Sequence, residues 1–308
     1  MKRLSKLMMV CIMAAVMMLP VSCQKENNAP NIPDPPIIPD PPIFPDGVLP
    51  SSFSVSATQQ VHFSQGNMQY QASTNTWRFA EHQYDFVGTQ TADDYGYYGG
   101  NVSGSDNHSI SSTYNGWIDL FGWGTGSNPT LSSNIDGYYG TFVDWGCNAI
   151  SNGGDTANQW RTLTQAEWEY LLNTRTDASS KRGIGNINGV GGLIILPDSC
   201  TLPSECSFTS GFATDNFYNY PDWTHNSYTL AQWAQMEAAG AVFLPAAGYR
   251  NGTNVYYVGN YGYYWSSTPK NEIDAYCIFF YGNNLDATDH GHRSFGFSVR
   301  PVFGTINY

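Results

Sequence analysis

A proline-rich stretch divides this 308-residue chain into an N-terminal segment and a part long enough to fold. Nine of the 21 residues at 30–50 are proline, and the sequence Ile-Pro-Asp-Pro-Pro-Ile occurs at 32–37 and again at 38–43. Proline fixes φ and lacks the backbone N–H, so this stretch forms neither a helix nor a central strand. It predicts either an extended polyproline stalk or a disordered linker, and it confines the folded part to residues 51–308.

Residues 1–22 have the pattern of an export signal. Three basic residues precede an uncharged run at 7–21, which is shorter than the roughly 20 residues that a membrane-spanning helix needs. The small residue before Cys23 resembles the processing site of bacterial lipoproteins, which implies lipidation of Cys23. The polar residues 24–26 resemble the export tag of Bacteroidetes surface lipoproteins. We expect a lipid-anchored protein on the outer face of the outer membrane; ordinary signal cleavage with a free Cys23 is the alternative.

Composition limits the functions open to residues 51–308. Charged residues make up 12% of the chain, where about 25% is usual, and aromatic residues make up 15%. Beyond the export signal the chain has 10 basic and 25 acidic residues, which disfavours contact with nucleic-acid phosphates. In an exported protein, Cys200 and Cys206 predict a local disulfide, while Cys147 and Cys277 either pair or stay free.

Two sequence patterns predict helices within a chain that otherwise favours strands and loops. Thr164 and Thr229 are each followed three residues later by Glu or Gln, so each predicts a capping box, with helices at 165–173 and from 230 to the residue before Gly240. Residues 89–158 lack periodicity and predict long ordered loops. The expected class is α+β, with two short helices and antiparallel sheets. Alternation or β-rich composition predicts strands at 60–63, 68–71, 77–80, 193–196, 242–244, 263–267, 275–281 and 295–302.

Several separate motifs resemble families that share one fold. The sequence WRTLTQAEWEY at 160–170 is similar to the first-helix signature of the formylglycine-generating enzyme superfamily. The sequences at 243–250, 264–268 and 296–302 are similar to the domain named for the Fibrobacter succinogenes major paralogues. The resemblance spans residues 53–303 and implies a C-type-lectin-like fold for the domain at 51–308.

The residues that enzymes and lectins of these families need are missing. The oxidase requires a pair of cysteines for copper in its C-terminal part, where this chain offers Cys277 by itself. The tripeptides that bind calcium in C-type lectins do not occur. His290 and His292, with Asp286 and Asp289 nearby, form too small a ligand set to predict a metal site. We therefore expect no catalytic residues, no cofactor and no metal.

The C-terminal part has the composition of a binding surface. Tyr, Asn, Ser and Gly provide contact area and hydrogen bonds at low entropic cost, as they do in antibody paratopes. From Ile273 onward there is no Glu, Lys, Gln, Met or Trp, and this part resembles the variable regions of proteins diversified by retroelements. Equally, a Tyr- and Asn-rich β surface excludes long charged side chains without diversification. The expected ligand-binding residues are Tyr256, Tyr257, Tyr261, Tyr263, Asp274, Tyr281, Asn283, Asp286, Asp289, His290, His292, Ser294 and Phe295.

The sequence thus predicts a signal peptide at 1–22, a lipidated Cys23 with a stalk at 23–50, and a non-enzymatic binding domain at 51–308. The expected partners are a protein or glycan ligand at the cell surface and, through the lipid anchor, the membrane. A structural or adhesive component of a surface assembly is the first alternative. An enzyme of the formylglycine-generating type is the second.

Overall fold

The computed structural model describes residues 44–88, 107–108, 110–131, 141–212 and 223–304. The expected export signal, Cys23 and most of the stalk lie outside these residues. A compact unit, here called the head, begins at Ile43, so it includes residues 44–50, which the sequence assigns to the stalk. The backbone explains why: Leu49 N donates a hydrogen bond to Phe63 O (2.9 Å), which holds this segment against the next strand.

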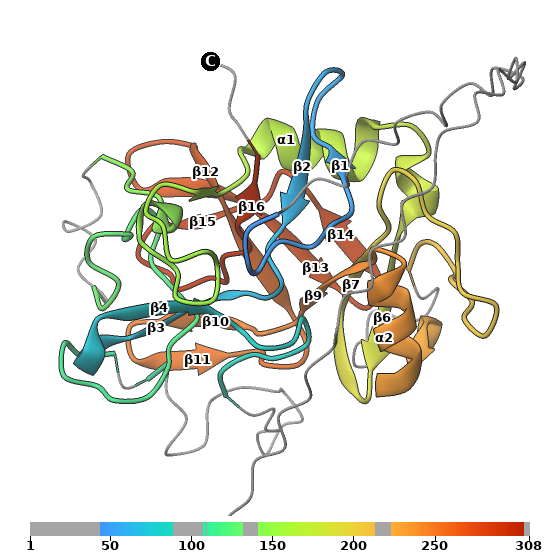
Figure 1. The fold of residues 1–308 in the computed structure, drawn as a ribbon. Coiled ribbons are helices and arrows are strands. Elements are labelled where there is room, and N and C mark those ends of the chain that lie inside the picture. The colour runs from blue at the N-terminus through green and yellow to red at the C-terminus, as the bar shows by residue number, and fades with distance from the viewer. Residues whose placement is uncertain (1–43, 89–106, 109, 132–140, 213–222, 305–308) are drawn as a thin grey trace, which may run out of the picture. The chain divides into compact units, whose positions relative to one another are not determined.

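The described residues form an α+β structure whose strand pairs are antiparallel except for β6 with β8 (Figure 1). Two four-stranded sheets have the orders β1-β2-β16-β5 and β8-β6-β7-β9. In a third sheet, β13 pairs with β12, β14 and β15, and β3-β4 and β10-β11 are separate hairpins. The strands are β1 (Phe53–Ser54), β2 (Gln60–Phe63), β3 (Met68–Gln71), β4 (Thr76–Phe79), β5 (Trp160–Arg161), β6 (Arg182–Ile187), β7 (Val190–Ile195), β8 (Ser227–Tyr228), β9 (Val242–Pro245), β10 (Tyr249–Asn251), β11 (Asn254–Tyr256), β12 (Gly262–Pro269), β13 (Asp274–Tyr281), β14 (Asn284–Asp286), β15 (His290–His292) and β16 (Val302–Phe303).

Both predicted helices begin where their capping boxes place them. Helix α1 (Gln165–Glu169) continues into a π-helical turn (Tyr170–Thr174), and α2 covers Leu230–Ala238. The side chains of Thr164 and Thr229 accept hydrogen bonds from the third backbone N–H of each helix, and the residue at that position bonds back. None of the helices in the described residues combines the length and apolar character needed to cross a bilayer. Short 3-10 helices cover Ala72–Thr74, Trp145–Cys147, Ala178–Lys181 and Trp223–His225.

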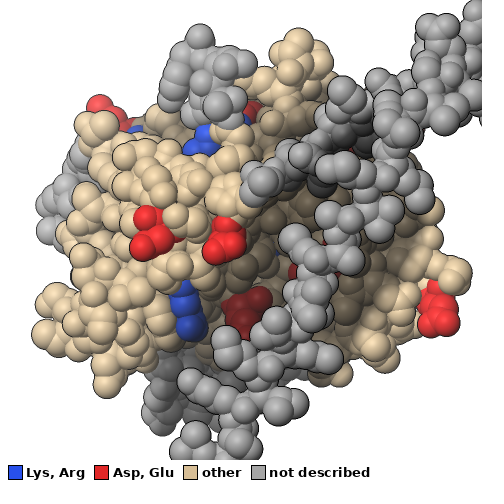
Figure 2. Space-filling model, viewed as in Figure 1, with Lys and Arg blue, Asp and Glu red and all other residues tan. Residues whose placement is uncertain are grey.

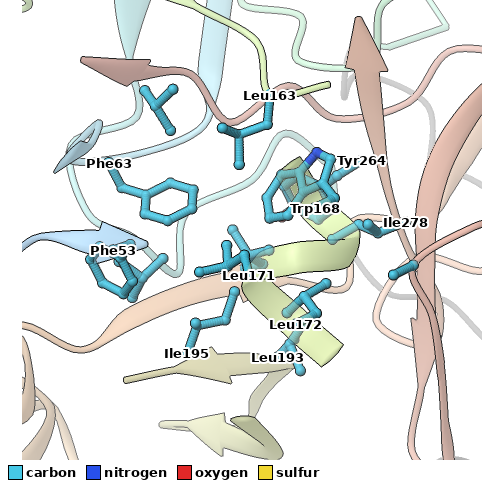
Figure 3. Close-up of a cluster of buried hydrophobic side chains, with 14 of the residues drawn as sticks. Phe53, Phe63, Leu163, Trp168, Leu171, Leu172, Leu193, Ile195, Tyr264 and Ile278 are labelled. Atoms are coloured by element: carbon cyan, nitrogen blue, oxygen red, sulfur yellow. The ribbon is translucent and has the colours of Figure 1, made fainter. Parts of the chain in front are cut away.

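The core cluster in Figure 3 joins the first helix to three of the sheets. Trp168, Leu171 and Leu172 lie three and four residues apart, so they share one face of the helix and are buried together. Burying each leucine stabilises the head by about 2 kcal/mol. The sheets contribute buried side chains that include Phe53, Phe63, Leu193, Ile195, Tyr264 and Ile278.

The prediction of a strand at 295–302 is wrong for most of its length, because the regular strand there covers only Val302–Phe303. The preceding residues instead form single bridges to three different segments. Gly296 pairs with Arg250, Phe297 with Phe121, and Ser298 with Tyr264. This segment therefore connects separate parts of the head, although its alternating side chains resemble those of a strand in one sheet.

The expected disulfide between Cys200 and Cys206 is not formed, and all four cysteines of the described residues are free thiols. The Cys200 Sγ lies 3.7 Å from Ala239 O, and the Cys206 Sγ lies 3.6 Å from Gln232 O. Gln232 lies in the first turn of α2 and Ala239 caps its C-terminal end, and seven residues span about 10 Å in a helix. Each thiol contacts its own end of the helix, and this keeps the sulfur atoms apart.

Candidate functional site

Eight half-buried aromatic side chains form a continuous surface, here called the tyrosine surface. They come from β10, β11, the segment after β11, β12, β13 and the segment after β15. Each ring lies within 6.5 Å, centroid to centroid, of at least one other ring of the set. The residues are Tyr249, Tyr256, Tyr257, Tyr261, Tyr263, Phe279, Tyr281 and Phe295.

Strand register places several of these rings next to one another. Tyr249 is opposite Tyr256 in the β10-β11 hairpin, and their rings stack at 5.3 Å. Tyr263 is opposite Phe279 in the β12-β13 pair, and these rings stack at 4.6 Å. Directly paired residues of antiparallel strands point to the same face. The alternation of β13 brings Tyr281 to that face as well, 5.4 Å from Phe279.

A turn with unusual backbone geometry holds two more rings. Tyr257 has φ +56°, in the left-handed region that aromatic residues rarely adopt. Its carbonyl accepts hydrogen bonds from Asn260 N and Tyr261 N, both at 3.0 Å. The rings of Tyr257 and Tyr261 stack at 4.4 Å as a result. Such a conformation persists when its surroundings determine it, so the turn holds these two rings in place.

Buried aromatic residues support the tyrosine surface from below. The Phe297 ring stacks on Tyr263 at 4.7 Å and on Trp265 at 4.1 Å. Trp265 is fully buried, and its Nε1 donates a hydrogen bond to Phe121 O (2.7 Å). The outer rings therefore rest on the core and present a rigid surface.

Two carboxylates lie at one edge of the tyrosine surface. Asp286 is directly opposite Phe279 across β13 and β14, and its Oδ1 accepts hydrogen bonds from the backbone and hydroxyl of Thr288 (both 2.8 Å). The Asp289 carbonyl accepts a hydrogen bond from Cys277 N (2.8 Å). Burial, and then the charge of Asp286, raise the pKa of the Asp289 carboxyl. Asp286 is thus close enough to act on the Asp289 carboxyl.

The same environment keeps the neighbouring phenol and thiol protonated. Burial, and then nearby Cys277 and Asp289, raise the pKa of Tyr263. Burial, followed by the charges of Asp289 and Asp286, raises the pKa of the Cys277 thiol well above its usual value. A thiolate nucleophile or soft-metal ligand needs the opposite shift. Among the residues described, no three His, Cys, Asp or Glu side chains are grouped so that they could hold a metal ion.

The structure brings together part of the predicted binding set. Six of its residues are members of the tyrosine surface, namely Tyr256, Tyr257, Tyr261, Tyr263, Tyr281 and Phe295, and Asp286 and Asp289 form its acidic edge. Asn283 is in the turn after β13, where its Oδ1 is buried without a hydrogen-bond partner in the structure. Ser294 is half-buried in the turn after β15.

The remaining predicted residues lie on the other face of β13. His292 is opposite Asp274, and His290 is opposite Tyr276. Side chains alternate along a strand, so residues 274 and 276 and their partners are on the face of the sheet opposite to that of Phe279. The His292 ring does approach Phe295, at 5.3 Å, from the end of its strand. Asp274 is on the face of the sheet away from the tyrosine surface, whereas the His290 ring reaches the acidic edge, with Nδ1 3.9 Å from Asp289 Oδ1.

Two members of the tyrosine surface, Tyr249 and Phe279, were not among the predicted residues. The Tyr249 ring contacts those of Tyr256, Tyr257 and Phe295, which makes it the centre of the set. Phe279 could have been found from its spacing, because it precedes Tyr281 by two residues in a predicted strand and so shares its face. No comparable signal marks Tyr249, whose strand has three residues.

Comparison with protein families gives one match that includes the whole tyrosine surface. A family described as a domain of unknown function, DUF8237, matches residues 226–302, a quarter of the chain. The matched segment runs from the residues before α2 to the first residue of β16. Comparisons with curated proteins and with solved structures give no match.

Proposed function

We propose that the protein is a non-enzymatic, lipid-anchored protein of the outer membrane, exposed at the cell surface, whose head binds a protein or glycan ligand through the tyrosine surface. The observation that carries this proposal is the continuous set of half-buried rings on a sheet with a fully buried aromatic floor. Aromatic residues dominate binding energy at interfaces and lose little entropy on binding. Rings already fixed by their neighbours lower that cost further.

We also propose a C-type-lectin-like fold for the head. Support comes from the α+β class, from the two capped helices at their expected positions and from the order of the sequence motifs. A catalytic role receives no such support, because the Cys277 thiol is buried and its pKa is raised. Diversification of the C-terminal part stays a proposal that rests on its composition.

Replacement of three outer rings tests the proposed binding surface. We expect Tyr257→Ala, Tyr261→Ala and Tyr281→Ala together to lower binding to a printed glycan array and a peptide array by about tenfold or more. The melting temperature should fall by only a few degrees, because Phe297 and Trp265 beneath the rings are unchanged.

Tyr276→Ala is the matched control. Tyr276 is also half-buried in β13, but it points to the opposite face. If binding survives the triple replacement and is lost in Tyr276→Ala, the ligand binds the opposite face of β13 and the proposed site is wrong. A protein that binds neither array but copurifies with a stoichiometric partner, lost only in the triple variant, would support the structural alternative.

A further inference from the structure

The tyrosine surface lies on a head that keeps few of its own cations accessible. Nine lysines and arginines belong to the described residues, and five of these are buried arginines. On the face shown in Figure 2, charged side chains are sparse, and acidic ones are more evident than basic ones. The buried arginines are Arg161, Arg175, Arg250, Arg293 and Arg300.

The other four cations have partners outside the tyrosine surface. The Arg78 guanidinium lies 3.7 Å from the centre of the Trp117 ring, and Lys181 Nζ donates a hydrogen bond to Asp198 O (2.9 Å). Arg182 lies over the Phe212 ring (5.7 Å). Lys270 lies 6.0 Å from the ring of Tyr276, on the opposite face of β13, and its charge also lowers the pKa of the Asp289 carboxyl at the acidic edge. The cation–π contacts that the head makes internally therefore use other rings.

Negative potential gathers where the rings are most concentrated. The face of an aromatic ring is negative because of its quadrupole. Asp286 and Asp289 add two carboxylates beside Tyr263 and Phe279, and the Asp289 side chain is still 30% exposed. A cation placed over these rings gains from the ring faces and from both carboxylates, whereas an anion is repelled by both. A neutral sugar gains nothing from the acids except hydrogen bonds.

We infer that the ligand of the tyrosine surface is a protein segment that presents a cationic side chain, lysine, methylated lysine or arginine, to the rings beside Asp286 and Asp289. This inference rests on the proposed binding function and narrows it to a positively charged peptide. Charge complementarity selects this occupant, because the rings and Asp286 have no lysine or arginine beside them among the described residues, and the His290 ring, 3.9 Å from Asp289, is the nearest ionisable cation to that acid. Acidic and neutral glycans become the alternatives that the experiment must separate.

The test uses the purified protein and an array of peptides with the same uncharged flanking sequence. Their central residue is Lys, trimethyl-Lys, Arg, Gln or Glu. A glycan array with neutral and acidic members is probed in parallel, and binding to an acidic glycan or to the Glu peptide would contradict the cationic inference. We expect binding to the three cationic peptides, weakened by about tenfold when Asp286→Asn and Asp289→Asn are combined. Raising the salt from about 50 mM to about 500 mM should weaken this binding as well.

Asp177→Asn with Glu205→Gln is the control, because both residues are exposed and the change in net charge is the same. It should leave cationic binding unchanged. The protein could instead bind neutral glycans or Gln peptides in a way that requires the tyrosines and not the two acids. That result would overturn the cationic inference and leave the proposed function standing. Binding that ignores both the tyrosine and the aspartate replacements, or no binding at all, would overturn both.

Discussion

At the scale of single residues, Asp119 is a buried acid whose pKa is raised. It is fully buried, and its carboxylate accepts hydrogen bonds from Val87 N (2.7 Å) and Asn107 Nδ2 (2.8 Å). The Asn107 amide oxygen in turn accepts from Asp119 N (2.9 Å). Despite these hydrogen bonds, burial raises the pKa of Asp119 to about 6. One carboxyl thus links two segments that are 20 residues apart in sequence.

The raised pKa of Asp119 predicts a particular dependence of stability on pH. A carboxyl whose pKa is higher in the folded state stabilises the fold in its protonated form, below the unfolded pKa of about 3.9. This contribution, about 3 kcal/mol from the difference in pKa, should disappear as the pH rises to about 6 and stay absent above it. Urea unfolding of the wild type and of Asp119→Asn between pH 4 and pH 8 isolates the group, because other carboxyls contribute equally to both curves. Parallel curves would show that Asp119 is not perturbed.

The sequence predicted six of the eight residues of the tyrosine surface but did not predict Tyr249, which is at its centre. Tyr257, Tyr261 and Tyr281 could be predicted because tyrosines in polar surroundings favour a surface role. Tyr249 could not, because its position depends on the β10-β11 hairpin and on the segment around Phe295, 46 residues later. His290 was assigned to the site from composition, without the register that places it on the opposite face.

At the scale of elements, the two helix starts give a direct prediction. We expect Thr164→Ala and Thr229→Ala each to lower the free energy of unfolding by about 1 kcal/mol, because each removes the side-chain acceptor of a capping box. The other half of the first box, the hydrogen bond from Thr164 N to Glu167 Oε2 (2.8 Å), does not use the threonine side chain, and two hydrogen bonds from Arg161 (2.7 and 2.8 Å) keep Glu167 in place. Denaturant unfolding measures both variants.

Thr156→Ala is the control for the capping variants, since this exposed threonine lies outside the helices and should change the free energy by less than about 0.5 kcal/mol. Equal losses in all three variants would mean that the effect comes from threonine itself and has nothing to do with capping. Loss of ligand binding in a stably folded Thr229→Ala protein would argue against a purely structural role for that residue.

Strands and helices that have a pattern within their own sequence could be predicted. Strands that depend on contacts with residues far along the chain could not. Strands β2 and β3 begin and end as expected, because their side chains alternate between core and surface or carry β-rich composition. Strand β6 was missed because Gly183 and Gly185 suggest a loop. A Cβ at Gly185 would lie 2.5 Å from Asn226 O, so the strand needs glycine where another backbone approaches.

At the scale of the whole molecule, the lipid anchor is the main prediction. We expect Cys23→Ser to release the protein from the membrane, because the uncharged run at 7–21 is too short to span a bilayer. Fractionation of cells that express the wild type or the variant measures the release. Cys200→Ser is a suitable control, since its thiol contacts α2 within the head. A Cys23→Ser protein that stays with the membrane would contradict lipid anchoring.

The sheet β1-β2-β16-β5 also determines when the head can fold. Val302 pairs with Phe63 and Arg161, so β16 separates two strands that the ribosome makes long before it. Until residue 303 has been synthesised, β2 and β5 lack the neighbour that joins them, and pairing across such sequence distances is slow. This sheet therefore cannot be completed before residues 302 and 303 have been made. For the exported protein proposed above, such late completion keeps this sheet open while the chain passes through a secretion channel.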